Sequence, residues 1–165
     1  MTLKNAFIYA TMLLATQFTF SGIASAHEYK GGNLHIDHPW SKEVPPTSQV
    51  AAAFFTIDNH GKETDTLLSA SSPIAGKTEL HAHVNENGMM KMREVQEITI
   101  PAEGQQNLKP GGLHIMFFDL KKTPALGESF PLTLNFQHAG TVEVEVKVEK
   151  ATYQSDAMKM DHSGH

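Results

Sequence analysis

Two side chains that could bind a soft metal stand two residues apart in the segment PGGLHIMFFDL, residues 110–120. In a β-strand, His114 and Met116 fall on one face because side chains alternate with a period of two. Ile115 and Phe117 then fall on the opposite face. The pair His114 and Met116 is therefore either packing within a β-sheet or half of a metal site, and the remaining sequence distinguishes the two.

A second segment rich in histidine and methionine, ELHAHVNENGMMKMREV, spans residues 79–95. The Asn-Gly pair that ends NENG is typical of a tight β-hairpin turn. His81 and His83 share one face of the strand before the turn, and Met90 and Met92 share one face of the strand after it. A hairpin brings such faces together, so a histidine of one strand can lie near a methionine of the next.

The elements that would position these residues are short strands. The turn formers VPPTS, DNHGKE, NENG, KPGG and QHAG separate alternating or apolar runs, and no helical period appears beyond the first 26 residues. The pattern predicts a single all-β domain, a Greek-key sandwich or barrel. The predicted strands are 33–40, 50–58, 65–70, 77–84, 89–95, 97–101, 105–109, 113–120, 129–136 and 141–149.

The two ends of the chain differ from this domain. Residues 1–26 have a positive start, the apolar run FIYATMLLATQFTF and the small residues ASA, the pattern of a secretory signal peptide. The run is too short and too interrupted for a stable membrane span, so no membrane insertion is expected after cleavage behind Ala26. The domain is assigned to residues 27–150. Residues 151–165 lack an alternating apolar face and are predicted to form a flexible tail rich in Met and His.

Composition narrows the function classes. The chain has ten histidines, eight methionines and no cysteine, with a formal net charge of −5. Without thiols it cannot perform disulfide exchange or build a blue-copper site, which needs a cysteine thiolate. Without a basic stripe, nucleic acid is not an expected partner. Imidazole and thioether ligands favour a soft or borderline metal ion instead.

The two metal-binding segments combine into the pattern H-x10-M-x21-H-x-M, set beside PGG-HIM and ASSP. This arrangement resembles the periplasmic copper chaperone family PCu(A)C. The similarity extends from HPW at 38–40 to FPLTLNF at 130–136. The resemblance implies a cupredoxin-like Greek-key β-sandwich in the periplasm, and the implied Cu(I) ligands are His81, Met92, His114 and Met116.

Family resemblance also implies a role. Members of this family bind Cu(I) and help to deliver copper to cytochrome c oxidase, so the expected partner is a CuA-bearing oxidase subunit or a thiol-based copper carrier. Two thioethers and two imidazoles are neutral, and they suit Cu(I) better than a hard cation. The chain is therefore predicted to be a copper carrier and not an enzyme.

Other residues are secondary candidates. His83 stands where many family members have methionine, so it is either an alternate ligand or a surface imidazole. Some members carry a Met- and His-rich extension associated with a second copper ion, which can be Cu(II). The residues of this kind in the tail are Met158, Met160, His162 and His165. They form either a second copper site or a solvated segment.

Several residues are interpreted without a metal role. His60 and His138 lie in predicted turns and are expected to be exposed, and Trp40 is expected to be buried. Met89 and Met90 are interpreted as packing at the rim or contacts near the turn.

Two functions from other classes stay open. The first is a copper-dependent oxidoreductase that uses the tail or His27, whose amino group and imidazole could chelate Cu(II). The second is a copper-buffering protein that confers tolerance and has no dedicated acceptor.

Overall fold

A computed structural model describes residues 28–152, which form eleven strands and no helix. No helix in this range is long and apolar enough to cross a membrane. The strands are β1 (Glu28–Gly31), β2 (Leu34–Lys42), β3 (Val50–Asn59), β4 (Asp65–Ser71), β5 (Ala75–Glu86), β6 (Met89–Glu94), β7 (Ile98–Ile100), β8 (Gly104–Leu108), β9 (His114–Leu120), β10 (Ser129–Phe136) and β11 (Gly140–Glu149).

The strands form one continuous sheet that folds over a shared core. Its order is β6-β5-β9-β3-β2-β11-β10-β4-β7, while β1 pairs with β2 and β8 pairs with β3. Strands β2 and β11 are parallel, and the other strand pairs of the described chain are antiparallel. Phe117 on β9 packs edge to face against Phe130 on β10, with ring centroids 5.4 Å apart. These strands are not neighbours in the sheet, so the contact crosses the core, and the predicted all-β sandwich is confirmed.

Strand β11 illustrates why the sequence folds this way. Val142, Val144, Val146 and Val148 are all buried, and Glu143 between the first two is exposed. This period of two places every valine in the core, where burial of each contributes roughly 1.5–3 kcal/mol relative to exposure. Alternation alone was therefore enough to predict this strand.

Each of the ten predicted strands overlaps an observed strand, and the strand β1 was not predicted. β1 is four residues long and none of them is buried, so it has no apolar pattern to detect. It is added to the sheet through backbone pairing with β2. The predicted signal peptide, His27 and the four candidate metal ligands of the tail lie outside the described residues.

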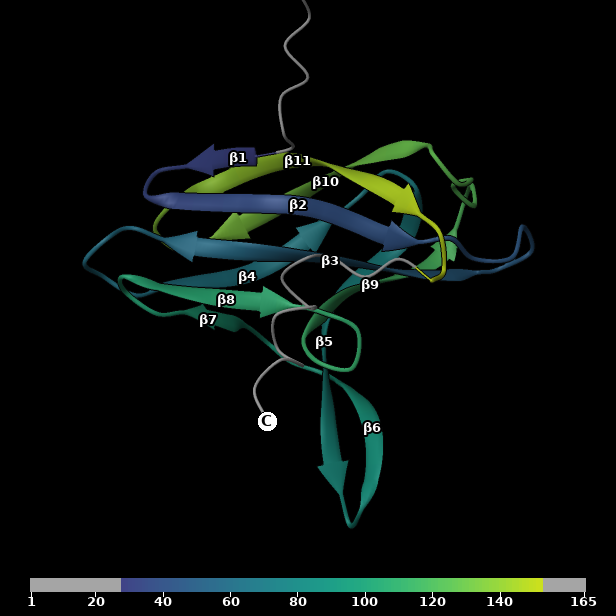
Figure 1. Cartoon of the computed structure of the whole chain (residues 1–165), viewed down its shortest axis with the longest axis horizontal. Helices are drawn as coiled ribbons and strands as arrows, with labels where there is room; N and C mark the ends of the chain where they lie inside the picture. Colours follow the sequence, from purple (N-terminus) through teal and green to yellow (C-terminus); the bar gives the residue numbers. More distant parts are fainter. Residues whose placement is uncertain (1–27, 153–165) are drawn as a thin grey trace, which may run out of the picture.

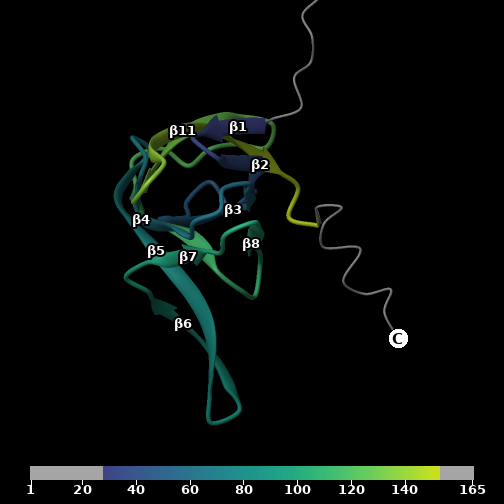
Figure 2. The same cartoon turned by 90° about the vertical axis from the view of Figure 1, so that its left-hand side faces the viewer.

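The β5–β6 hairpin extends away from the body of the sandwich (Figures 1 and 2). Its turn residues Asn87 and Gly88 have positive φ values of 54° and 82°, which is the geometry that an Asn-Gly turn favours. Met89 and Met90 follow directly and are 60% and 58% exposed. Of the two interpretations of these methionines, contact near the turn fits their position better than packing at the rim, because solvent reaches both side chains.

Candidate metal site

The predicted metal residues lie on one face of three neighbouring strands, because β5 pairs with β9 on one edge and β6 on the other. His81 on β5 is directly opposite His114 on β9, and their ring centroids are 5.7 Å apart. Met116 stands two residues beyond His114, so it shares this face and is a diagonal neighbour of His81. The fold thus brings together three residues from distant parts of the sequence.

The hairpin register adds the fourth predicted ligand and the secondary candidate. Met92 lies directly opposite His83, whereas His81 lies opposite Glu94. Met92 is therefore a diagonal neighbour of His81, a spacing that long side chains can bridge. The His83 ring is also 5.4 Å from the His114 ring between centroids. We call the set His81, His83, Met92, His114 and Met116 the His–Met cluster.

Exposure changes steeply across the His–Met cluster. His114 is 2% exposed, His81 and Met116 are intermediate, and Met92 on the hairpin is 50% exposed. The buried end of the cluster is held by the sandwich, and the exposed end belongs to the extended hairpin. A partner molecule could therefore reach Met92 before any other member of the set.

The KPGG turn positions His114. Gly111 has a φ of +79°, and the Gly112 N–H donates to the Lys109 carbonyl at 2.9 Å, which closes a tight turn. The Gly112 carbonyl then lies 3.0 Å from His114 Nδ1 and also accepts the backbone N–H of His83 at 3.2 Å. One carbonyl therefore fixes both the ring of His114 and the strand that carries His83.

This contact determines which nitrogen of His114 is free. A carbonyl can only accept, so Nδ1 carries the proton and Nε2 keeps its lone pair. Burial lowers the pKa of His114, which outweighs the opposing effect of the Gly112 carbonyl. The ring is consequently neutral near pH 7, the form in which imidazole binds metals.

Glu79 supplies a second polar contact that sequence reasoning missed. Its Oε2 lies 2.7 Å from His81 Nε2, and its Oε1 lies 2.6 Å from Lys77 Nζ. Hydrogen bonding to His81, and then to Lys77, lowers the pKa of Glu79. The signal was present in the sequence, because Glu79 is two residues before His81 and thus on the same strand face.

Two imidazole nitrogens of the cluster have no hydrogen-bond partner. Nδ1 of His81 and Nδ1 of His83 are both buried and unpaired. Buried polar atoms in folded proteins are nearly always satisfied, and exceptions need a reason such as a binding role. Together with Nε2 of His114, these atoms are the candidate nitrogen donors of the cluster.

Aromatic rings pack beside the cluster. The Phe54 ring lies 6.2 Å from that of His114 and 4.9 Å from that of Trp40, and the Phe118 ring lies 5.7 Å from that of His81. Trp40 is buried as predicted, but a bulge places it on the face of the cluster. The register of β2 with β3 shifts by one residue around His38, whose φ is +49°, and a single extra residue reverses the faces of the residues that follow.

Within residues 28–152, no three side chains of the types His, Cys, Asp and Glu are arranged to hold a metal ion. The His–Met cluster offers methionine sulfur as well as imidazole.

Three other histidines, His35, His60 and His138, lie outside this cluster. His60 and His138 are exposed, as predicted. His35 Nδ1 lies 2.6 Å from a carboxylate oxygen of Glu28, and the His35 ring packs edge to face against that of His60 with centroids 4.6 Å apart. These residues do not contact the His–Met cluster in any described interaction.

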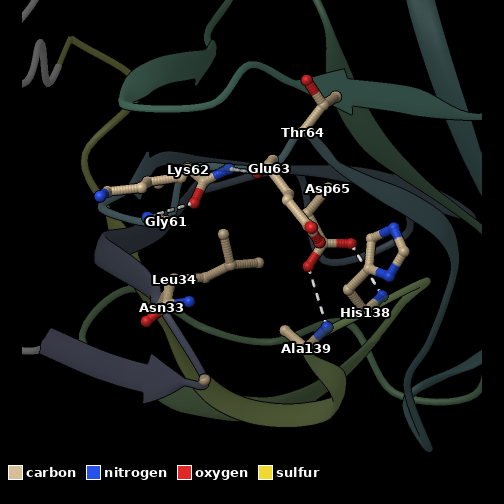
Figure 3. A pocket seen from close by; sticks show the side chains of 11 residues that line it. Asn33, Leu34, Gly61, Lys62, Glu63, Thr64, Asp65, His138 and Ala139 are labelled. Atoms are coloured by element: carbon tan, nitrogen blue, oxygen red, sulfur yellow. Dashed lines mark hydrogen bonds between the residues drawn. The ribbon is translucent and has the colours of Figure 1, made fainter.

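A pocket bounded by the β1–β2, β3–β4 and β10–β11 connections has a different character (Figure 3). The Asp65 carboxylate at its wall accepts backbone N–H groups from Thr66, His138 and Ala139 at 2.7, 2.9 and 2.9 Å. Burial alone would raise the pKa of Asp65, but these three donors together lower it. The carboxylate is satisfied by the chain itself, so we interpret this pocket as structural.

The sequence of this chain matches a known protein family. The family model described as "Putative lipoprotein LpqE-like" matches residues 34–148, which include every strand except β1 in whole or nearly in whole. The chain belongs to this family. It is 36% identical over 117 residues to "Putative lipoprotein Lxx21020" of Leifsonia xyli subsp. xyli, covering 70% of this chain and 69% of that protein. It is 31% identical over 122 residues to "Uncharacterized protein RP573" of Rickettsia prowazekii, covering 70% of this chain and 66% of that protein.

Solved structures similar to this LpqE-like protein include copper-bound ones. The copper-bound PCuAC domain from PmoF2 is 25% identical, with a TM-score of 0.66, and the match covers 75% of this chain and 98% of that domain. The CuI form of DR1885 from Deinococcus radiodurans is 29% identical, with a TM-score of 0.59, and the match covers 78% of this chain and 85% of that protein. The resemblance to the PCu(A)C family and its fold is therefore confirmed.

Proposed function

We propose that this protein is a periplasmic copper chaperone that binds Cu(I) and passes it to an acceptor in the assembly of the CuA centre of cytochrome c oxidase. The proposed ligands are His81, Met92, His114 and Met116. The observation that carries the proposal is the register of β6, β5 and β9, which places all four on one face of the sheet. The copper-bound forms of the PmoF2 domain and DR1885 support the choice of metal.

The donor chemistry explains why the cargo is Cu(I). Thioether sulfur prefers a soft ion, and neutral imidazole accepts the same ion. Four neutral ligands leave one positive charge at the site, which costs less beside the Phe54 and Phe118 rings than a divalent ion would. The lone pair of His81 Nδ1 is then used rather than left buried without a partner, and the lone pair of His114 Nε2 is available to the same ion.

The gradient of exposure suits a carrier better than an enzyme. The most buried ligand, His114, would hold the ion, and the half-exposed Met92 would be the first ligand that an acceptor replaces. Stepwise replacement of ligands moves an ion without releasing it into water. His83, opposite Met92, is proposed as an alternate ligand during such a transfer.

Periplasmic location rests on the predicted signal peptide at residues 1–26, with 27–150 as the copper-binding domain. A relative named as a lipoprotein supports export of the family to the cell envelope. We propose in addition that Met158, Met160, His162 and His165 in the tail 151–165 bind a second copper ion as Cu(II). Deletion of residues 155–165 is expected to lower the copper stoichiometry, and an unchanged stoichiometry would contradict the tail site.

X-ray absorption of the Cu(I)-loaded mature chain tests the ligand set directly. The expected spectrum contains two sulfur and two nitrogen scatterers, and a spectrum without sulfur would contradict the proposal. Anaerobic titration of a Met92→Ala, Met116→Ala double variant provides the functional counterpart, with loss of tight Cu(I) binding expected. Wild-type affinity in that variant would also contradict the assignment.

A deletion strain tests the acceptor. If the protein is an assembly chaperone, the deletion strain is expected to lose cytochrome c oxidase activity. Added copper is expected to restore that activity. Sensitivity to excess copper with normal oxidase activity would favour copper buffering instead. None of the described residues favours the oxidoreductase alternative, whose residues lie outside the described range.

A further inference from the structure

The two nitrogens of the His81 ring are in different environments. Nε2 lies 2.7 Å from a carboxylate oxygen of Glu79, and the two side chains are only 12% and 14% exposed. Nδ1 is buried and has no hydrogen-bond partner. An ionised carboxylate has no proton to donate, so in the neutral imidazole, the form that binds metal ions, Nε2 carries the proton and Nδ1 the lone pair.

Glu79 is itself held in place. Lys77 Nζ lies 2.6 Å from Oε1, the carboxylate oxygen that does not contact His81. Lys77 also lies over the Phe118 ring, 4.9 Å from its centroid. The carboxylate is therefore bound on both sides, and rotation of its side chain would break the hydrogen bond with His81 or the ion pair with Lys77.

His114 has the reverse arrangement. Its Nδ1 donates to the Gly112 carbonyl at 3.0 Å, which leaves Nε2 with the lone pair. His81 and His114, which are paired across β5 and β9 with ring centroids 5.7 Å apart, thus keep their lone pairs on different nitrogens.

We propose that Glu79 is a positioning residue that makes His81 bind copper through Nδ1, while His114 binds it through Nε2. The proposal rests on the proposed function, because it concerns the same Cu(I) site. A carboxylate or carbonyl that accepts the second ring N–H of a metal-binding histidine fixes the ring and makes it a stronger ligand. Here Glu79 serves His81 and the Gly112 carbonyl serves His114.

Nitrogen-15 NMR of the mature chain can read both assignments. Cu(I) is diamagnetic, so long-range proton–nitrogen spectra can be recorded before and after addition of one equivalent under anaerobic conditions. Before copper, His81 is expected to be protonated at Nε2 and His114 at Nδ1. After copper, the large nitrogen shifts are expected at Nδ1 of His81 and Nε2 of His114.

The variant Glu79→Gln tests the positioning role. The neutral amide can either accept from or donate to the ring, so His81 should populate both tautomers before copper is added. The Cu(I) affinity, measured by competition with bicinchoninate, is expected to fall by about 10–100-fold, the usual cost of losing such a partner. Glu86→Gln is the matched control: Glu86 lies on the same strand but binds Lys91 and Arg93, so tautomers and affinity should stay unchanged.

The outcomes separate this inference from the proposed function. A copper-induced shift at Nε2 of His81, or a Glu79→Gln variant with wild-type tautomers and affinity, would overturn the role of Glu79 and leave the chaperone proposal standing. Absence of a copper-induced shift at both histidines of the wild-type chain would overturn the proposed ligand set itself. If Glu79→Gln folds poorly, Lys77→Met provides a second test of the same inference. It removes the ion pair at Glu79 Oε1 and keeps the contact between Oε2 and His81, so His81 should still bind copper through Nδ1.

Discussion

The pocket at Asp65 and the His–Met cluster both bury polar atoms, but they do so in opposite ways. The Asp65 carboxylate receives three backbone N–H groups from Thr66, His138 and Ala139. In the cluster, the Nδ1 atoms of His81 and His83 are buried without any partner. The chain itself supplies hydrogen-bond donors to the Asp65 carboxylate, whereas it supplies no hydrogen-bond partner to the two imidazole nitrogens.

The difference indicates what each region is for. A buried acceptor with matched donors stabilises the folded protein, because its hydrogen bonds within the chain are lost on unfolding. A buried acceptor without donors costs about 1–3 kcal/mol in the free protein, and a ligand that occupies it recovers this energy. Removal of a polar group should therefore have opposite effects on stability in the two regions.

Met116→Leu gives the largest expected effect on copper. Leucine and methionine have similar volumes, so the free energy of unfolding should change by less than about 1.5 kcal/mol. Loss of a proposed direct ligand should lower the Cu(I) affinity by more than about 100-fold, since loss of a residue that hydrogen-bonds a metal ligand already lowers affinity by about 10–100-fold. Chelator competition and urea denaturation measure the two quantities. A marked loss of stability with unchanged affinity would assign Met116 to packing instead.

Asp65→Asn should destabilise the protein. The amide can accept only through one oxygen and turns its NH2 group toward backbone donors, so we expect a loss of about 1.5–3 kcal/mol in the free energy of unfolding at pH 7. Urea denaturation of the metal-free protein measures it. Cu(I) affinity of the folded variant should stay at the wild-type value, and a large change in affinity would contradict the separation of the two regions.

The contribution of Asp65 to stability depends on pH in a direction that its lowered pKa determines. The pKa of Asp65 is lowered in the folded protein from its ordinary value of 3.8, so the folded state binds the proton less readily than the unfolded state. The stabilisation by Asp65 is therefore complete above about pH 3.8 and disappears as the pH falls through the lower folded value. The stability difference between wild type and Asp65→Asn should be constant near neutral pH and shrink below pH 4.

His83→Leu should have the opposite effect on the metal-free protein. Leucine fills much of the space of the imidazole and removes the unpaired Nδ1, so the free energy of unfolding should stay level or rise by about 1 kcal/mol. Thermal denaturation of both variants without copper shows whether the change in stability caused by His83→Leu has the opposite sign to that caused by Asp65→Asn. A loss of stability as large as that of Asp65→Asn would mean that His83 is a structural residue.

Sequence alone predicted most of this arrangement. Alternation identified the strand of His114 and Met116, and the Asn-Gly turn identified the hairpin that carries His83 and Met92. These features are local, and strand periodicity or turn chemistry determines each one. The pairing of β5 with β9 is not local, and only the spacing pattern of the PCu(A)C resemblance indicated it.

The features that escaped prediction depend on tertiary structure. Trp40 lies on the face of the cluster because a one-residue bulge at His38 reverses the alternation of β2, and no sequence period records such a shift. The three donors of Asp65 come from its own strand and from a distant turn. Glu79 is different, because its place on the strand face of His81 follows from the sequence separation of two residues.

Met90 and Met89 offer the finest test of the exposed end of the cluster. They are adjacent and almost equally exposed, at 58% and 60%, but Met90 shares the strand face of Met92 and Met89 points to the other face. A thioether beside Met92 can assist an incoming acceptor during ligand replacement, so Met90→Leu should slow Cu(I) transfer to bicinchoninate by about two- to fivefold, less than 1.4 kcal/mol of barrier. The equilibrium affinity should not change.

Met89→Leu is the matched control for that measurement, because it removes an equally exposed thioether from the face that does not carry the cluster. Its transfer rate should equal that of the wild type. Equal slowing in both variants would mean that general exposure of the hairpin, and not the face that carries Met92, determines the rate of exchange. A difference between the two would show that copper leaves along the side of the hairpin where the cluster opens to solvent.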